Sequence, residues 1–192
     1  MIIFIPKRFE EATLENYNIT TPEQQALIDH LKQSIKQGFK SNMFISGGVG
    51  TGKTHLAYAT LKSLEKADKK ELSGELKMIC RSKRTVYTSA KEIIDTIRAT
   101  WKKEPDTYDL EKLADIKNSN PLIIDEIGVQ YGTENERLEL FEIINYRYNE
   151  MLPTICLSNL DRKQIAQLLG QRISDRLFGG AVFFELTGKS AR

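Results

Sequence analysis

Short apolar runs alternate along this chain with longer segments in which apolar residues recur at helical spacing. The runs predict buried strands, and their alternation with helices favours an α/β fold with a mainly parallel central sheet. The predicted strands are 42–46, 84–88, 121–125, 153–157 and 181–186. The predicted helices are 22–37, 53–66, 89–103, 109–117, 133–151, 161–169 and 171–178. The remaining polar segment at 67–83 predicts an extended loop or insertion.

Two further patterns refine the predicted helices. The helices at 22–37 and 89–103 each begin with a capping box, in which a hydroxyl residue is followed three positions later by Gln or Glu. The helix at 133–151 carries an apolar stripe at helical periodicity. The members of that stripe are Leu138, Phe141, Ile144 and Tyr148.

The composition is that of a folded protein, because 40% of the 192 residues are hydrophobic and 28% are charged. No apolar run approaches the roughly 20 residues that a membrane-spanning helix needs. The apolar stretch at 1–5 is too short for the core of a signal peptide. We therefore expect a cytoplasmic protein with no membrane partner. We also expect one domain, in which residues 1–40 form an N-terminal extension and leading helix, and residues 41–192 form the core.

Basic residues concentrate between Lys66 and Lys103, where eleven Lys and Arg accompany five Asp and Glu, although the net charge of the whole chain is only +2. A locally basic segment is typical of a surface that meets a polyanion. It is equally typical of a solvated, lysine-rich face. The charge pattern leaves both interpretations open.

A glycine-rich segment lies between the first predicted strand and the second predicted helix. It reads Gly47-Gly48-Val49-Gly50-Thr51-Gly52-Lys53-Thr54 and fits the pattern G-x-x-x-x-G-K-S/T. Glycines let backbone N–H groups close around phosphate oxygens, and the N-terminus of the next helix adds positive potential. Lys53 is placed to reach the β- and γ-phosphates, and the Thr54 hydroxyl to bind Mg²⁺. We therefore predict that these residues, with His55 directly after them, bind ATP and Mg²⁺.

Two adjacent acids, Asp125 and Glu126, stand at the end of the predicted strand at 121–125. We expect Asp125 to hold Mg²⁺, directly or through water. We expect Glu126 to polarise a water molecule for in-line attack on the γ-phosphate. A small-molecule kinase needs the metal-binding Asp but no base that activates water. The pair therefore favours an ATPase over a phosphotransferase.

Asn159 follows the predicted strand at 153–157. In a parallel sheet the carboxyl ends of the strands lie along one edge, where ligands bind. We expect Asn159 to reach both the γ-phosphate and the attacking water from that edge. The alternative is an ordinary turn or helix-capping Asn.

With these motifs in place, the sequence resembles the AAA+ ATPase domain of DnaC-type replicative helicase loaders, a family that includes DnaI and the IstB transposition helpers. The resemblance implies a P-loop NTPase fold of AAA+ type, with three α-β-α layers around a mainly parallel sheet, and makes 41–192 the ATPase core. The stretches that carry it are FEEATLENYN at 9–18, SGGVGTGKTHL at 46–56, LIIDEIGVQ at 122–130, YRY at 146–148, LSN at 157–159, LGQRISDRL at 169–177 and GKSAR at 188–192.

The resemblance also implies roles that spacing alone does not assign. Arg176 matches the arginine finger that enters the ATP site of a neighbouring subunit, with Arg172 one helical turn earlier as the alternative. A finger that acts in trans implies head-to-tail self-association, as a ring or a helical filament. Arg192 matches the second sensor, which contacts the γ-phosphate within its own subunit. Tyr17 and Asn18 match the segment that borders the adenine base.

The predicted helix at 89–103 resembles the contact that this family makes with single-stranded DNA. In that contact a basic residue and an aromatic residue stand three positions apart, as Arg98 and Trp101 do, and Lys102 adds charge. An indole stacks on a base, and a guanidinium pairs with phosphate. The alternative for Trp101 is the core, because it continues the apolar stripe of Ile94 and Ile97.

Taken together, the resemblance implies an ATP-hydrolysing accessory protein of DNA replication. It would load a replicative hexameric helicase and bind single-stranded DNA in a bacterial or phage-infected bacterial cell. Longer family members carry an N-terminal helicase-binding domain, whereas 46 residues precede Gly47 here, so we expect that domain to be absent or replaced. Two alternatives stay open. One is a nucleotide-gated adaptor or inhibitor of a helicase or initiator with little ATPase of its own, and the other is an IstB-type transposition helper.

Overall fold

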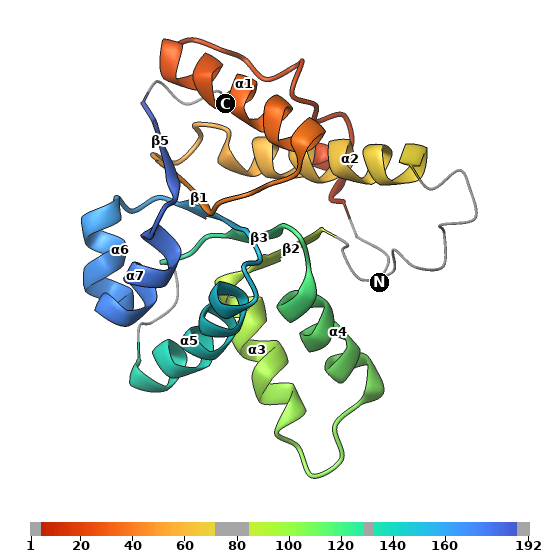
Figure 1. The fold of residues 1–192 in the computed structure, drawn as a ribbon, viewed down its shortest axis with the longest axis vertical. Coiled ribbons are helices and arrows are strands. Elements are labelled where there is room, and N and C mark those ends of the chain that lie inside the picture. The colour runs from red at the N-terminus through yellow and green to blue at the C-terminus, as the bar shows by residue number, and fades with distance from the viewer. Residues whose placement is uncertain (1–4, 72–84, 129–132, 188–192) are drawn as a thin grey trace.

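A five-stranded parallel sheet forms the centre of the computed structural model, which describes residues 5–71, 85–128 and 133–187 (Figure 1). The strands are β1 (Met43–Gly47), β2 (Val86–Ser89), β3 (Leu122–Asp125), β4 (Thr154–Ser158) and β5 (Val182–Leu186). Their order across the sheet is β2-β3-β4-β1-β5, and every neighbouring pair is parallel. The carboxyl ends of all five strands therefore lie along the same edge, as the alternating pattern predicted.

Helices cover both faces of this sheet, which confirms the three-layer α-β-α fold. Figure 1 shows the helices at 22–37 and 53–71 on one face of the sheet and the helices between residues 90 and 178 on the opposite face. A short 3-10 helix, η1 (Lys7–Phe9), precedes them. The helices are α1 (Pro22–Gln37), α2 (Lys53–Glu71), α3 (Ala90–Thr100), α4 (Thr107–Asn118), α5 (Glu134–Asn149), α6 (Arg162–Leu169) and α7 (Gln171–Phe178). None of the helices within the described ranges is long and apolar enough to cross a membrane.

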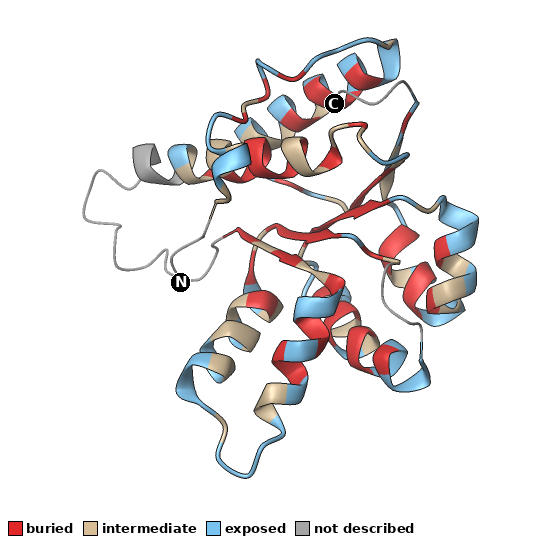
Figure 2. Cartoon of the chain, turned by 180° about the vertical axis from the view of Figure 1, so that it is seen from behind, coloured by how far each residue is buried: buried red, intermediate tan, exposed pale blue. Residues whose placement is uncertain are grey.

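The strands are apolar on both sides because each side packs against helices, as expected for a parallel sheet. Successive side chains of a strand point to opposite faces. In β1, Met43 and Ile45 join the core beneath α1 and α2, whereas Phe44 joins the core on the other side. Figure 2 shows the central strands as the most continuously buried part of the chain.

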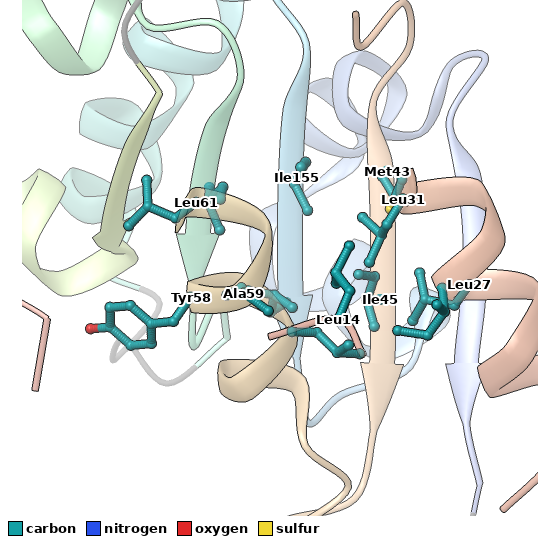
Figure 3. Close-up of a cluster of buried hydrophobic side chains, with 14 of the residues drawn as sticks. Leu14, Leu27, Leu31, Met43, Ile45, Tyr58, Ala59, Leu61 and Ile155 are labelled. Carbon is teal, nitrogen blue, oxygen red and sulfur yellow. The ribbon is translucent and has the colours of Figure 1, made fainter. Parts of the chain in front are cut away.

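The segment before α1 packs into the same core as the helices that follow. Ala12, Leu14 and Tyr17 are buried there, and Figure 3 shows Leu14 beside Ile45 of β1. The capping box predicted at the start of α1 is present, with Thr21 as its first residue. The boundary at residue 40 between extension and core remains an expectation.

Helices α2 and α3 differ in length from the sequence predictions, and the buried face of α5 is partly polar. Helix α2 continues to Glu71, so residues 67–71 are helical rather than part of a loop, and 72–84 lie outside the described residues. Helix α3 ends at Thr100 rather than near 103. In α5 the apolar stripe noted in the sequence is only partly buried, because Leu138 is 58% exposed and Tyr148 is 54% exposed. The buried face of α5 instead includes polar residues, and these are Glu136, Glu139 and Arg147.

Candidate nucleotide-binding site

The glycine-rich loop connects the end of β1 to the start of α2, as the sequence predicted. Gly47 pairs with Leu186 of β5, and a Cβ on Gly47 would lie 2.6 Å from the Leu186 carbonyl oxygen. Gly52 has a φ of +88°, and its Cβ would lie 2.5 Å from the Tyr17 ring. A larger residue at either position would push the loop away from its neighbours. Glycine at both positions therefore lets the backbone approach these neighbours closely, directly before a helix N-terminus, an arrangement that suits phosphate binding.

Lys53 places a positive charge inside this loop. Its Nζ donates to the carbonyl oxygens of Gly47 at 2.8 Å and of Gly48 at 2.9 Å. Burial lowers the pKa of Lys53, and the nearby charge of Asp125 offsets part of that effect. The amine therefore lies beside the backbone that would surround a phosphate, and it interacts electrostatically with the carboxylate of Asp125.

Asp125 brings the second half of the predicted site to the loop. It is 4% exposed, at the end of β3, and its Oδ2 accepts a hydrogen bond from the Thr54 hydroxyl at 2.9 Å. Strand β4 lies between β3 and β1 in the sheet. The hydrogen bond between Thr54 and Asp125 therefore connects the end of β3 to the helix that follows β1, although these two strands are not neighbours. A hydroxyl and a carboxylate side by side are the oxygen ligands that suit Mg²⁺. The residues at this position therefore fit the predicted metal.

Asp125 has two further donors that hold its carboxylate. Tyr87 of β2 donates its hydroxyl to Oδ2 at 2.8 Å, and the Glu126 backbone N–H donates to Oδ1 at 2.8 Å. Burial, followed by the charge of Asp125, raises the pKa of Tyr87 far above its usual value. The phenol therefore stays protonated and acts as a donor. No motif in the sequence marks Tyr87, because only the pairing of β2 with β3 brings it near Asp125.

Glu126 and Asn159 lie at the same edge, one residue beyond β3 and β4 respectively, and both are exposed. Glu126 has a φ of 55°, a left-handed conformation that costs energy in a residue with a side chain. Ser158, before Asn159, donates its hydroxyl to the Ile127 carbonyl at 2.6 Å and so ties the ends of the two strands together. The predicted base and sensor thus share one edge with Asp125.

The residues predicted near the adenine base join the N-terminal segment to the loop. The buried Tyr17 donates its hydroxyl to the Thr51 carbonyl at 2.7 Å, and the His55 ring nitrogen Nε2 lies 3.0 Å from the Thr13 carbonyl oxygen. Asn18 is exposed directly after Tyr17. These contacts place the segment against the loop, whereas its role toward adenine remains a prediction.

Arg176 is bound to its own subunit through α5 and α7. Its Nε donates to the Asn145 side-chain oxygen at 2.7 Å, and its Nη1 donates to the Arg172 carbonyl at 3.0 Å. Its guanidinium also lies over the Phe141 ring, 4.8 Å from the centroid. Arg172 is exposed. The choice between these two arginines as the finger remains a prediction, and Arg192 lies outside the described residues.

The predicted DNA-binding residues diverge at the end of α3. Trp101 is 66% exposed while Ile97 is buried, so the core alternative for Trp101 was wrong. The helix ends one residue before Trp101, so Trp101 does not continue the buried stripe of Ile94 and Ile97. Lys102 is also exposed, in the segment that joins α3 to α4, and Figure 1 shows that segment at the end of these helices far from the sheet. Arg98, in contrast, forms a two-pronged pair with the buried Glu139, at 3.0 and 3.1 Å, so its guanidinium already links α3 to α5.

The chain is similar in sequence to proteins of a known family. The sequence profile of the family described as IstB-like ATP binding protein matches residues 5–192. The replicative helicase loader DnaC of Escherichia coli strain K12 is 27% identical over 170 residues, which cover 88% of this chain and 63% of that protein. The chain thus spans less than two thirds of the length of this curated relative.

Solved structures show the same architecture. A crystal structure of the DnaC helicase loader has a TM-score of 0.76 at 22% identity, covering 95% of this chain and all of that one. The replication initiator DnaA bound to AMPPCP and single-stranded DNA has a TM-score of 0.70 at 26% identity, covering 94% of this chain and 52% of that one. The shared architecture agrees with the AAA+ fold expected from the motifs.

Proposed function

The chain belongs to the family of IstB-like ATP-binding proteins, and from this premise we propose that it is an ATP-hydrolysing loader of a replicative hexameric helicase. The observation that carries the proposal is the contact between Thr54 and Asp125 beside the buried Lys53. That contact unites a phosphate-binding loop with a metal-binding carboxylate. The relative DnaC is a replicative helicase loader, which supports the choice of helicase loading among the uses of such a site.

In this function the chain's own residues divide the work. The loop backbone and Lys53 bind the phosphates, and Thr54 with Asp125 would hold Mg²⁺, which neutralises charge on the phosphates when bound. Glu126 accepts a proton from the attacking water, and Asn159 orients that water from the end of β4. Both side chains are exposed at the edge where the strand ends meet, so they are accessible to nucleotide and water.

Single-stranded DNA and a second copy of the chain are the further proposed partners. Trp101 and Lys102 offer an exposed indole and a cation at one tip, which suits base stacking and phosphate contact. The structural relative DnaA is bound to AMPPCP and single-stranded DNA, which supports this pairing of ligands. Arg176 would act on the site of a neighbouring copy, giving a head-to-tail assembly.

The ATPase rate, measured alone, with single-stranded DNA and with helicase, tests the proposal. We expect either partner to stimulate turnover in the wild type and neither to do so in Glu126→Gln, which retains nucleotide binding. Glu142→Gln is the matched control, because Glu142 is exposed on α5. Turnover that survives in Glu126→Gln removes that residue as the base.

The ATPase measurement and a competition between oligonucleotides separate the alternatives. A nucleotide-gated adaptor or inhibitor would bind ATP but show no stimulation by DNA or helicase. A transposition helper would prefer duplex over single-stranded oligonucleotides in a competition assay. Either result would replace helicase loading as the function of this chain.

A further inference from the structure

Three aromatic rings form a column that ends at Asp125. Phe9, at the end of η1, stacks on Tyr58 of α2 with ring centroids 4.9 Å apart and planes inclined by 18°. Tyr58 contacts the Tyr87 ring at 4.4 Å between centroids. Figure 3 shows Tyr58 projecting from α2 toward the side of the sheet on which β2 lies. The Tyr87 hydroxyl completes the column by donating to Asp125. The N-terminal segment is thereby connected to the carboxylate expected to bind metal.

The donors on Asp125 are not equivalent. The Thr54 hydroxyl is itself expected to serve as a metal ligand. The Glu126 N–H belongs to the adjoining peptide and reaches only Oδ1. Tyr87 is the side-chain donor to Oδ2 that comes from a different strand and has no other assigned role. Groups that hydrogen-bond to a metal-binding carboxylate fix its orientation and tune its affinity for the metal.

Resting on the proposed nucleotide-binding function, we propose that Tyr87 is a positioning residue that orients Asp125 for Mg²⁺ and that the stack of Phe9 on Tyr58 holds the Tyr87 ring in place. Tyr58 is buried, so Tyr87 packs on a ring that is itself confined between η1 and β2. A confined ring holds its hydroxyl on Oδ2 and so preorganises the carboxylate. In this arrangement, docking of the segment around Phe9 and the Mg²⁺ response are physically linked.

Tyr87→Phe tests the first part, because it keeps the ring and removes only the hydroxyl. The probe is a fluorescent non-hydrolysable ATP analogue, and its binding is followed while Mg²⁺ is titrated. We expect the Mg²⁺ concentration at half-maximal response to rise about 10-fold, with unchanged affinity for the analogue in EDTA. Tyr146→Phe is the matched control, because it also removes a hydroxyl with one acceptor, Asn118, at 2.8 Å. Its Mg²⁺ midpoint should equal that of the wild type.

Phe9→Leu tests the second part, and it also keeps the proposal testable if Tyr87→Phe does not fold. It shortens the column at its far end without touching Asp125. We expect it to raise the Mg²⁺ midpoint by a smaller factor and to add nothing in a Tyr87→Phe background, since both changes act through one hydroxyl. Independent, additive effects would overturn the link between Phe9 and Tyr87.

The outcomes distinguish this proposal from the proposed function. A wild type that responds to Mg²⁺, with a Tyr87→Phe variant that responds equally, overturns the positioning role alone. An equal loss of affinity with and without Mg²⁺ also overturns it, because that pattern indicates a general structural effect. A wild type that binds no analogue contradicts the nucleotide-binding function itself, and the positioning role with it.

Discussion

Arg147 shows how much a single buried residue organises at the edge of the sheet where β3 and β4 begin, which is opposite the candidate site. It is 1% exposed, and its Nη1 donates to the carbonyls of Ile116 and Ser119 at 3.1 and 2.9 Å, while Nη2 donates to that of Pro153 at 2.7 Å. Burial lowers the pKa of Arg147 to about 9, which still leaves the guanidinium charged at neutral pH. One cation thus joins the end of α4 to the segments that enter β3 and β4.

Replacing Arg147 with Met is expected to lower the free energy of unfolding by at least about 3 kcal/mol. The reason is that several buried carbonyls lose their donor, at about 1–3 kcal/mol for each group left unsatisfied. Denaturant titration followed by circular dichroism measures this. Arg172→Met is the control, because Arg172 is exposed on α7, and it should leave the unfolding midpoint nearly unchanged. Equal midpoints for the two variants would contradict the account of Arg147.

At the scale of the element, α5 shows where reasoning from sequence succeeds and fails. Its start at the Thr133 capping box follows from local chemistry, which the sequence contains. Its buried face does not, because it includes Glu139, which is 4% exposed and pairs with Arg98, 41 residues away. A pattern of apolar positions does not predict the burial of a carboxylate whose partner lies far away in the sequence. The apolar Leu138 is left at the surface.

The candidate site also contains residues that the sequence predicts and residues that only the fold brings together. The loop at 47–54 and the pair Asp125 and Glu126 are contiguous motifs, so their chemistry is readable before any fold is known. Tyr87 carries no such signal, because its hydroxyl meets Asp125 only through the register of β2 on β3. The contact of Tyr17 with Thr51 is likewise invisible in the sequence, since it joins segments 34 residues apart.

Arg98 and Trp101 are both predicted to contact DNA, but substitutions of the two residues should have different effects. Trp101→Ala is expected to weaken binding of a single-stranded oligonucleotide by about 1–3 kcal/mol while leaving thermal stability unchanged. Arg98→Ala is expected to lower the melting temperature, because Glu139 stays buried without its partner. Fluorescence anisotropy and thermal unfolding measure the two effects. A drop in melting temperature for Trp101→Ala would contradict its exposed position.

At the scale of the whole molecule, the contacts of Arg176 bear on assembly. In the single chain its guanidinium is bound by Asn145 and lies over Phe141. A finger that serves a neighbouring subunit must exchange those contacts for contacts with that subunit. Assembly and activity are therefore expected to rise together with protein concentration.

A mixing experiment tests action in trans. Lys53→Ala supplies Arg176 but lacks the phosphate-binding lysine, whereas Arg176→Ala retains the lysine but lacks the finger. Each variant alone should be nearly inactive as an ATPase, and an equimolar mixture should recover part of the wild-type rate. A mixture as inactive as its components would show that Arg176 does not act on a neighbouring site.

In the proposed function, residues 47–54 and Asp125 bind the phosphates of ATP together with Mg²⁺. Calorimetric titration of the wild type and of Lys53→Ala with a non-hydrolysable ATP analogue, with and without Mg²⁺, tests it most directly. The account predicts saturable binding by the wild type that Mg²⁺ tightens, and no measurable binding by Lys53→Ala. Equal binding by the two proteins, or none by the wild type, would contradict it.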